Sequence, residues 1–546
     1  MKPRPPLDPL RALALIAAAF AFGACGGRDP GSESPPAGAP VVLNRGNGPE
    51  PESLDPQRAR TDAELSILRD LYEGLTALDA EARPAPGAAA SWTVSEDGRV
   101  YTFELRDNLR WSTGEPVVGE DFAFALRRLV DPRTASPYAA VVDVIGNATD
   151  ITAGRAPPES LGVEAPDERT LVIRLQSPAP YLPGVLAHPS TFPVHRASLA
   201  EHGREFSRPG RAVSNGAFVL EEWTVGSRIV ARRNPHYWDN ANNHIDRINF
   251  LQIADQSAEL NRYRGGELEV TYTVPASQFK WVRENLGPEL QVSPQLSTYY
   301  YGFNLYRAPF KDNRDLRLAL SMVIDRERLT ESVTGRGELA AYGWVPVGVA
   351  DYTSQKPSWA SLPFERRVAE AKRLYAKAGY SAAKPLRTEI RYNMDESHTR
   401  LAVAIAAMWK EHLGVEAELV GEEFKVLLQN IDRHDVTQVF RSNWAGDYND
   451  AYTFAQYLKS DFGINLPGYR NPRYDALLIE AAAETDRARR RALLEQAERL
   501  MLEDQPLLPL YFYVNKHLVK PYVTGWRNNV MNVQYSKNLT IERSTP

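Results

Sequence analysis

The sequence predicts an α/β fold. Residues 388–440 read as strand, helix, strand, helix and strand, an order typical of a parallel sheet covered by helices. Residues 99–106 and 170–175 alternate apolar and polar side chains like half-buried strands, and residues 121–130 between them have apolar residues at helical spacing. At about 100–200 residues per domain, a chain of 546 residues is long enough for several domains, each with its own core.

The composition is that of an ordinary globular protein and narrows the functional classes. Apolar residues make up 43% of the chain and charged residues 24%. The net charge of -5 argues against a nucleic-acid-binding protein, because such proteins usually carry an excess of basic residues. The single cysteine excludes disulfides within the chain and thiolate clusters for zinc or iron–sulfur.

No motif of a known catalytic or nucleotide-binding site occurs in the sequence. Gly-x-Ser-x-Gly, His-Glu-x-x-His, the phosphate-binding loop and Gly-x-Gly-x-x-Gly are all absent. His188, His195 and His202 are spaced seven residues apart, but Pro189 and Pro193 argue against a helix that would place them on one face. We therefore expect these histidines in turns or on the surface, and we expect no enzyme activity, no cofactor and no metal site.

The N-terminal residues 1–24 have the pattern of a bacterial signal peptide. A basic segment is followed by an uninterrupted apolar run over residues 12–22, which is too short to span a membrane as a helix. Small residues directly before Cys25 resemble the lipoprotein cleavage box, although Phe22 stands where leucine is usual. We expect Cys25 to become the lipid-modified first residue of the mature chain. An ordinary signal peptide followed by a chance cysteine is the alternative.

Residues 25–40 are dominated by Gly, Pro and Ser and contain nothing to bury, so they predict a disordered tether. Folding should start near Val41, and no later run approaches the roughly 20 apolar residues of a membrane span. The expected location is the periplasm, with a lipid anchor in a bacterial membrane.

The remaining elements follow in chain order. The helix at 121–130 should end at Asp131-Pro132, because proline disfavours helical backbone at the residue before it. The C-terminal half predicts strands at 388–393, 415–420 and 436–440, helices at 398–413 and 424–431, two amphipathic helices within 473–503 and a strand at 507–519. Ligands of parallel sheets bind at the carboxyl ends of the strands. This rule indicates the segment 441–448 as a candidate site.

An ordered series of short segments resembles the peptide/nickel branch of the extracellular solute-binding proteins that serve ABC importers. The likeness covers roughly residues 41–546 and no single motif in it is specific. It includes Ala90-Ser91-Trp92, Tyr101-Thr102-Phe103-Glu104-Leu105-Arg106, Trp111-Ser112-Thr113-Gly114-Glu115-Pro116, Asp131-Pro132-Arg133-Thr134-Ala135-Ser136-Pro137-Tyr138, Asn215-Gly216-Ala217, Thr298-Tyr299-Tyr300-Tyr301 and Lys377-Ala378-Gly379-Tyr380.

The resemblance implies a two-lobed periplasmic-binding-protein-like fold that closes on its ligand by hinge motion, with an additional small domain. By the same comparison, lobe I combines residues 41–72, 197–297 and 515–546. The small domain occupies 73–196, and lobe II occupies 298–514.

The chemistry of a free peptide sets what such a cleft must contain. Burying the terminal ammonium or carboxylate without a partner would cost several kcal/mol, so an acid is needed at one end and a base at the other. Asp447, which follows a predicted strand, fits the first role, and the resemblance implies that it holds the ligand's α-ammonium. Arg441 fits the second role, because guanidinium stays charged and can bind a carboxylate with two hydrogen bonds.

The spacing of these two residues constrains the site. Across six residues a straight strand would separate them by about 20 Å, more than the roughly 10 Å of a short extended peptide. We therefore expect the chain to turn between Arg441 and Asp447, or the arginine to reach inward.

The resemblance implies further ligand contacts. His398 would meet the carboxylate of longer peptides, Tyr138 would contact the ligand backbone, and Trp444 would line a side-chain pocket. Asn393 and Phe424 would border the same cleft. A helix-surface histidine and ordinary core aromatics are the competing interpretations.

Two more residues of the candidate segment, Asn443 and Ala445, complete the expected peptide site.

Two positions depart from the family pattern. Arg60 stands where a close relative has a pocket glutamate, which could shift preference toward acidic side chains. Thr334 stands where a relative has a lysine that serves dipeptide carboxylates, although Arg336 lies nearby.

The expected function is that of a monomeric receptor that captures short oligopeptides in an extended conformation. It would deliver them to a membrane permease with ATPase subunits, and no nucleic acid is expected as a partner. Murein peptides are acidic, so a cell-wall peptide-binding protein is a serious alternative. A nickel chelate, haem or sugar within the same family, and an exported peptidase, are further alternatives; a sugar needs neither Asp447 nor Arg441.

Overall fold

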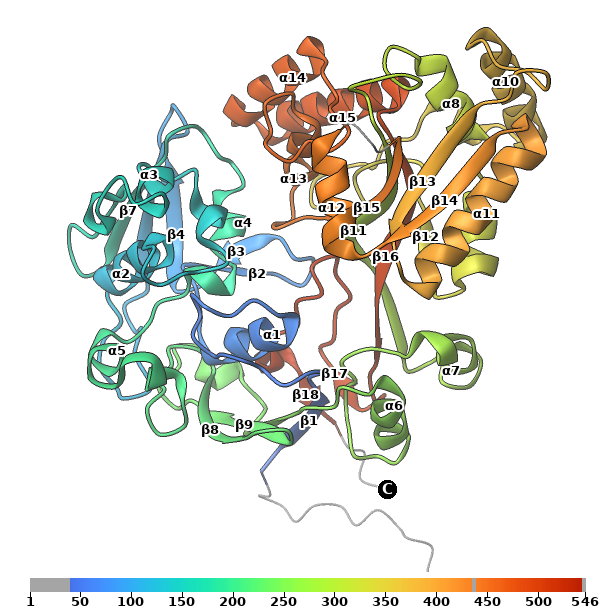
Figure 1. Ribbon diagram of the computed structural model, residues 1–546. Helices are drawn as coiled ribbons and strands as arrows, with labels where there is room; N and C mark the ends of the chain where they lie inside the picture. Colours follow the sequence, from blue (N-terminus) through green and yellow to red (C-terminus); the bar gives the residue numbers. More distant parts are fainter. Residues whose placement is uncertain (1–39, 435–437, 543–546) are drawn as a thin grey trace, which may run out of the picture. The chain divides into compact units, whose positions relative to one another are not determined.

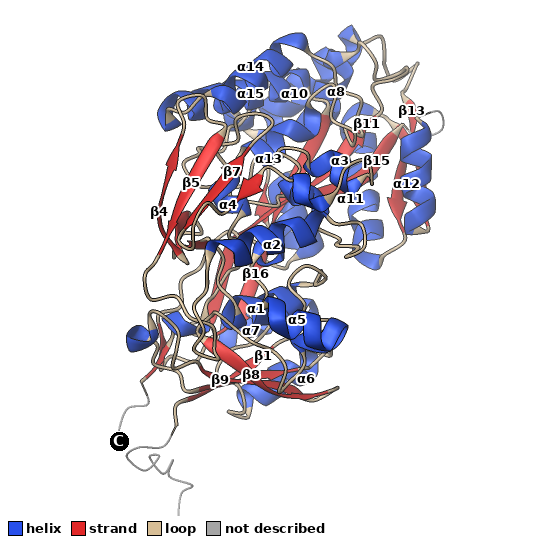
Figure 2. Ribbon diagram, turned by 90° about the vertical axis from the view of Figure 1, so that its left-hand side faces the viewer, coloured by secondary structure: helices blue, strands red, loops and turns tan. Residues whose placement is uncertain are grey.

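Helices and strands alternate through the chain, as predicted for the α/β class (Figures 1 and 2). The computed structural model describes residues 40–434 and 438–542. The predicted signal peptide and Cys25 lie outside the described residues, as does the tether up to residue 39. The first strand, β1, begins at Val42, which confirms that folding starts near Val41.

The largest sheet has six strands and contains the predicted parallel unit. Strands β13 and β14 pair in parallel, and so do β13 and β15, whereas β11 pairs antiparallel with both β15 and β16. The sheet is therefore mixed, with its parallel part at one side. In spatial order the strands are β12 (Leu339–Ala340), β16 (Leu507–Leu518), β11 (Leu290–Phe303), β15 (Val439–Ala445), β13 (Arg387–Asn393) and β14 (Glu416–Glu422).

Two helices of the parallel unit pack against β13 and β14 (Figure 1). They are α11 (Glu396–Leu413) and α12 (Phe424–Arg433). Helix α11 begins two residues before the predicted start, because the Asp395 carboxylate accepts hydrogen bonds from the backbone N–H groups of Ser397 and His398. It ends as predicted at Gly414, whose positive φ of 73° closes the helix in a conformation that glycine adopts without strain.

The predicted end of the strand at Phe440 is wrong. Strand β15 continues to Ala445, because its antiparallel pairing with β11 extends from Val439 opposite Phe303 to Ala445 opposite Ser297. On the other side, the pairing with β13 stops at Phe440. Within the described residues, the edge of β15 from Arg441 to Ala445 therefore has a strand partner only on the β11 side.

A smaller antiparallel sheet lies between residues 89 and 174 and confirms the two alternating strands and the helix between them (Figure 2). Helix α2 (Gly119–Val130) ends before Asp131, as predicted. The strands, in spatial order, are β4 (Ala89–Val94), β5 (Val100–Leu105), β7 (Thr170–Arg174) and β6 (Val163–Glu164).

A third sheet brings together the N-terminal strand and three strands from the middle of the chain. Its order is β1 (Val42–Gly46), β10 (Arg247–Leu251), β9 (Arg228–Arg233) and β8 (Phe218–Thr224), and only the β1–β10 pair is parallel. Two short ribbons are formed by β2 (Thr76–Leu78) with β3 (Pro84–Pro86) and by β17 (Val523–Thr524) with β18 (Thr540–Ile541).

The other α-helices complete the described chain. The two amphipathic helices predicted within 473–503 are confirmed as α14 (Pro472–Ala483) and α15 (Arg487–Asp504). The rest are α1 (Asp62–Leu71), α3 (Ala148–Thr152), α4 (Leu182–Val185), α5 (Arg196–His202), α6 (Gln256–Arg264), α7 (Phe279–Asn285), α8 (Arg314–Met322), α9 (Arg326–Arg328), α10 (Phe364–Lys377) and α13 (Tyr452–Ala455). No helix among residues 40–434 and 438–542 has both the length and the apolar character needed to cross a membrane.

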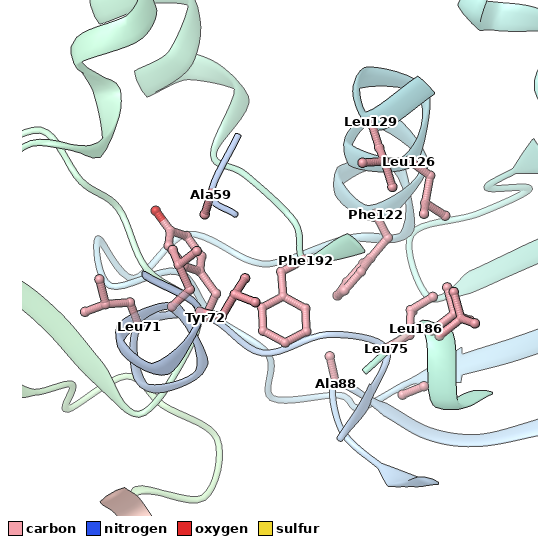
Figure 3. Packing of buried hydrophobic residues seen from close by; sticks show 14 of the residues in the cluster. Ala59, Leu71, Tyr72, Leu75, Ala88, Phe122, Leu126, Leu129, Leu186 and Phe192 are labelled. Atoms are coloured by element: carbon pink, nitrogen blue, oxygen red, sulfur yellow. The ribbon is translucent and has the colours of Figure 1, made fainter. Parts of the chain in front are cut away.

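The largest hydrophobic core joins the two smaller sheets. Buried residues of α1, α2 and the segment before α5 meet in it, and Figure 3 shows Leu71, Phe122 and Phe192 among them. Strands β11 and β16 run together for most of their length and cross the expected lobe boundaries at 297/298 and 514/515. The division into two lobes and a small domain therefore stays a prediction.

Replacing Phe122 by alanine should destabilise the protein by about 3–5 kcal/mol, because the ring is completely buried and the truncation leaves a cavity. Phe124→Ala on the same helix is the matched control, since that side chain is only partly buried and should cost clearly less. Urea unfolding followed by circular dichroism measures both free energies of unfolding. Equal losses for the two variants would contradict the packing described here.

Candidate functional site

The carboxyl edge of the parallel strands gathers a set of polar side chains around Arg441. This residue lies on β15 and is 8% exposed. Its Nη1 donates to Oδ1 of Asn393, the last residue of β13, at 3.1 Å, and its Nη2 donates to the hydroxyl of Tyr513 on β16 at 3.4 Å. The guanidinium also lies 4.9 Å from the ring centre of Tyr299 on β11. Four strands thus position one buried cation.

The charge of Arg441 has no acidic partner among residues 40–434 and 438–542. No described Asp or Glu forms an ion pair with it, and its buried Nε donates no hydrogen bond within the described chain. Guanidinium remains protonated even when it is buried, so this site keeps a full positive charge. The arrangement is suited to a carboxylate supplied from outside the chain.

His398 lies beside this positive site, in the first turn of α11. Its Nδ1 lies 3.2 Å from the Tyr299 hydroxyl. Burial lowers the pKa of His398 from its ordinary 6.5 to about 4, and the charges of Arg441 and Arg336 act in the same direction, against the opposing carboxylate of Asp395. The structure therefore brings Asn393, His398 and Arg441 together, as the sequence analysis expected.

Three residues of this cluster were not among the predicted ligand contacts. Tyr299 bridges Arg441 and His398, Tyr513 accepts from Arg441, and Arg336 holds the neighbouring Ser397 hydroxyl at 2.6 Å. For Tyr513 the sequence did contain a signal, because the alternation of side chains along a strand places Tyr511 and Tyr513 on the same face of β16. Tyr511 stacks on Tyr299 with ring centres 4.6 Å apart.

Asp447 lies two residues beyond the end of β15 and also lacks a partner. Its carboxylate makes no hydrogen bond or ion pair within the described chain. The surrounding protein desolvates it in part, which raises the pKa of the Asp447 carboxyl, although the side chain remains accessible. The negative charge acts on Tyr138, whose pKa is raised by burial, by Asp62 and by Asp447. Asp447 therefore lies near enough to Tyr138 for its charge to act on the hydroxyl.

The segment between the two charges is extended. Arg441, Asn443 and Ala445 alternate along β15 and so share one face, and the last two are exposed. At about 3.3 Å per residue this face spans roughly 13 Å before Asp447 begins a bend. The expected turn is thus absent between Arg441 and Ala445, and Asp447 lies in the bend that follows β15.

Trp444 lies on the other face of β15. Its indole N–H donates to the Thr453 carbonyl at 2.9 Å, and its ring centre is 4.8 Å from that of Tyr457. Two exposed apolar side chains instead follow the strand ends at the Arg441 side: Met394 after β13 is 69% exposed, and Phe424 at the start of α12 is 50% exposed. Phe424 is thereby placed at the edge where the sequence analysis expected it.

The structure does not bring Arg60 to the Arg441 cluster. Its guanidinium pairs with Glu52 at 2.6 Å, with both side chains more than half exposed, and only its carbonyl contacts the Tyr138 hydroxyl, at 3.4 Å.

The expected surface or turn histidines have local roles: His188 and His195 each accept a hydrogen bond from the first turn of the helix that follows.

A buried cation on β15 and an accessible carboxylate beyond the end of that strand are groups that could hold a small solute with charges of both signs. The chain belongs to the bacterial extracellular solute-binding proteins, family 5, whose middle-region model matches residues 83–465. It is 39% identical to the periplasmic oligopeptide-binding protein OppA of Escherichia coli over 505 residues, or 92% of this chain and 92% of that protein.

Two further comparisons concern murein peptides. The chain is 39% identical to the periplasmic murein peptide-binding protein MppA of Escherichia coli over 495 residues, covering 90% of this chain and 91% of that protein. The solved unliganded open form of an MppA murein tripeptide-binding protein superposes with a TM-score of 0.87 at 38% identity, covering 92% of this chain and 98% of the other. The match confirms the expected two-lobed binding-protein class of fold.

Between pH 6.5 and pH 4, the free energy of unfolding of the protein should fall more steeply than that of the His398→Gln variant. The folded-state pKa of His398 is about 4, below its ordinary 6.5, so the unfolded chain binds the proton first and unfolding is favoured as the pH drops through this window. Urea unfolding of both proteins at pH 7 and at pH 4.5 measures the difference, in which the contributions of all other groups cancel. Parallel pH profiles would contradict the desolvated, cation-flanked position of His398.

Proposed function

We propose that the protein is the peptide receptor of an ABC importer, with Arg441 and Asp447 as anchors for the two termini of the ligand. The observation that carries this proposal is the pair of opposite charges without partners in the described chain, one at each end of the exposed face of β15. The peptide carboxylate would replace the missing acid of Arg441, and its α-ammonium would meet Asp447. The relation to OppA supports the same ligand class.

The edge of β15 would hold the backbone of the peptide. From Arg441 to Ala445 this edge lacks a strand partner on the β13 side within the described residues. An extended peptide could add there as a strand and satisfy its own N–H and C=O groups. The face of β15 from Arg441 to Ala445 already spans roughly 13 Å, which favours peptides longer than two residues. Arg336 would add positive charge beside the carboxylate of the ligand, and neutral His398 would offer it a ring N–H. Tyr138 and Trp444 would contact the backbone and side chains of the peptide.

The remaining parts of the proposal concern partners and location. The receptor would close its two lobes on the peptide, release it to a permease with ATPase subunits and carry out no chemistry on it. It would act as a monomer in the periplasm, anchored through a lipid on Cys25. The periplasmic relatives OppA and MppA support the compartment.

A second candidate ligand is an acidic murein peptide. The solved MppA structure is a close structural match, and Arg60 lines a hollow of about 460 Å³ in which arginines outnumber acidic residues. The other arginines are Arg58, Arg204 and Arg208, and the acids are Glu52, Asp55 and Glu205. An acidic side chain could be accepted there. Tyr138 connects this region to the peptide site through its hydrogen bond to the Arg60 carbonyl.

Native mass spectrometry of protein purified from a bacterial periplasm without refolding should show a series of bound masses that match mixed short peptides. Extended binding through backbone and termini predicts such tolerance, because side chains would contribute little to affinity. A single acidic mass would instead identify the murein candidate. Protein that carries no ligand and shows no shift with peptide libraries would contradict both candidates.

Asp447→Asn should weaken the binding of trialanine by at least about 1.5 kcal/mol, because the ammonium loses a charge-assisted hydrogen bond. The same substitution should leave the affinity for N-acetyl-trialanine nearly unchanged, since that peptide has no ammonium. Arg441→Gln should show the reverse pattern, with trialanine weakened and trialanine amide unaffected. Isothermal titration calorimetry of the unchanged protein and of both variants measures these affinities.

The crossed design controls for general damage to the fold. A variant that has merely lost structure would weaken the free and the capped peptides alike. Undiminished trialanine affinity in folded Asp447→Asn would rule out this residue as the ammonium anchor.

A further inference from the structure

Arg69, near the end of α1, is a cation without an acidic partner in the described chain. Its Nε is buried and donates no hydrogen bond within residues 40–434 and 438–542. Its two Nη groups have no hydrogen bond or ion pair with the described residues either, but they are in contact with solvent, because the side chain is only partly buried. A ligand can therefore reach the Nη groups, whereas it could not reach the Nε.

Two acids close to Arg69 in the sequence already have partners. The Asp70 carboxylate lies 3.9 Å from the guanidinium of Arg45, and both of these side chains are buried. The Glu73 carboxylate lines one small hollow together with Arg69, but it accepts a hydrogen bond from the Lys537 ammonium at 2.9 Å. Neither acid is therefore available to neutralise Arg69.

A third acid, Asp62, lies on the same face of α1 as Arg69, because seven residues correspond to nearly two helical turns. This spacing separates the two residues by about 10 Å along the helix axis, so Asp62 acts on Arg69 only at a distance. Burial lowers the pKa of Arg69 from its ordinary 12.5, but a guanidinium remains protonated in a protein. The positive charge of Arg69 thus lacks a counter-ion within the described chain.

The position of Arg69 relates it to the Asp447 end of the proposed peptide site. Helix α1 packs against the short helical turn Pro189–Thr191. His188, directly before this turn, packs on Tyr138 with ring centres 4.4 Å apart. The charges of Asp447 and Arg69 both act on the Tyr138 hydroxyl, with opposite signs. Tyr138 therefore lies within reach of two charges that have no partner of their own.

The chemistry of this pair indicates what a ligand should carry. A peptide held by its ammonium at Asp447 would have its first residues beside Tyr138. A backbone carbonyl there could accept one hydrogen bond from Arg69 but would leave its charge uncompensated. A side-chain carboxylate would neutralise the charge and could accept from both Nη groups at once. An acid near the ammonium therefore fits Arg69 better than a neutral group.

We propose that Arg69 makes the receptor prefer short peptides with an acidic side chain at the first or second residue. The two Nη groups would pair with that carboxylate while Asp447 holds the α-ammonium. This inference rests on the proposed function, because it takes the orientation of the peptide from Asp447. It does not involve Arg60, whose guanidinium is paired with Glu52.

Isothermal titration calorimetry with acidic peptides and their uncharged isosteres tests the preference. The two pairs are Asp-Ala-Ala with Asn-Ala-Ala and Ala-Glu-Ala with Ala-Gln-Ala. In at least one pair we expect the acidic peptide to bind at least about tenfold more tightly, and Arg69→Gln should reduce this ratio to about one. Arg69→Lys should restore part of the ratio, because it keeps the charge but loses the two-pronged geometry. Arg155→Gln, at an exposed ion pair with Asp150, is the matched control and should keep the full ratio.

A third pair controls for the position of the acid. Ala-Ala-Glu and Ala-Ala-Gln carry the difference at the other end of the peptide, so their affinity ratio should be the same in Arg69→Gln and in the unchanged protein. An equal fall in this ratio would show a general loss of positive field and would overturn the inference.

Trialanine separates this inference from the proposed function on which it rests. Folded Arg69→Gln should bind trialanine nearly as well as the unchanged protein does, since trialanine has no acidic side chain. If trialanine binds but acid and isostere bind equally in both amino-terminal pairs, only the role of Arg69 is overturned. The same holds if folded Arg69→Gln keeps the full preference. If the unchanged protein binds none of these peptides, the proposed function fails and the role of Arg69 fails with it.

Discussion

The candidate site depends on the unequal pairing of strand β15. Its β11 side is paired from Val439 to Ala445, whereas its β13 side is paired only at Val439 and Phe440. The antiparallel partner keeps the strand straight beyond the end of the parallel pair, and the loss of the parallel partner leaves one backbone edge open. A sheet edge inside a protein normally has to be covered or interrupted. Here the open edge lies between Arg441 and Asp447, and under the proposed function the backbone of the peptide would pair with it.

The buried arginines of the described chain have different kinds of partner. Arg128 is paired with Asp55, and Arg490 is paired with Asp450. Arg326 has no carboxylate, but it donates to the carbonyls of Pro509, Ser321 and Ile324 and to the Ser321 hydroxyl.

Arg441 has only two neutral acceptors, at 3.1 and 3.4 Å, and aromatic rings around them. Isolating a charge in this way lowers stability, because the lost hydration is not replaced. Arg367 is likewise buried and donates only to the Tyr342 hydroxyl, so Arg441 is distinguished by its position beside the open edge of β15. Asp447, beyond the end of the same strand, also has no partner within the described chain.

Much of this arrangement could be predicted from the sequence, because local patterns determine it. Period-two and helical spacing located β5, α2, β7, α14 and α15, and the order of elements predicted the parallel unit. The end of β15 could not be found in this way. The residues after Phe440 alternate no more clearly than a loop would, and the strand continues only because β11, more than 130 residues earlier, pairs with it. The roles of Tyr299 and Tyr513 were missed for the same reason, since both come from strands distant in sequence that meet only in the folded sheet.

The loop after β15 fixes the position of the proposed ammonium anchor. Asp447 is accessible, whereas its neighbour Tyr448 is buried and its ring stacks on that of Tyr181. The Asn449 side chain donates to the Ala82 carbonyl at 2.8 Å, and the Asp450 carboxylate is paired with Arg490. The three residues after Asp447 are thus held by separate contacts, so the loop can present an unpaired carboxylate without itself being free to move away from the open edge of β15.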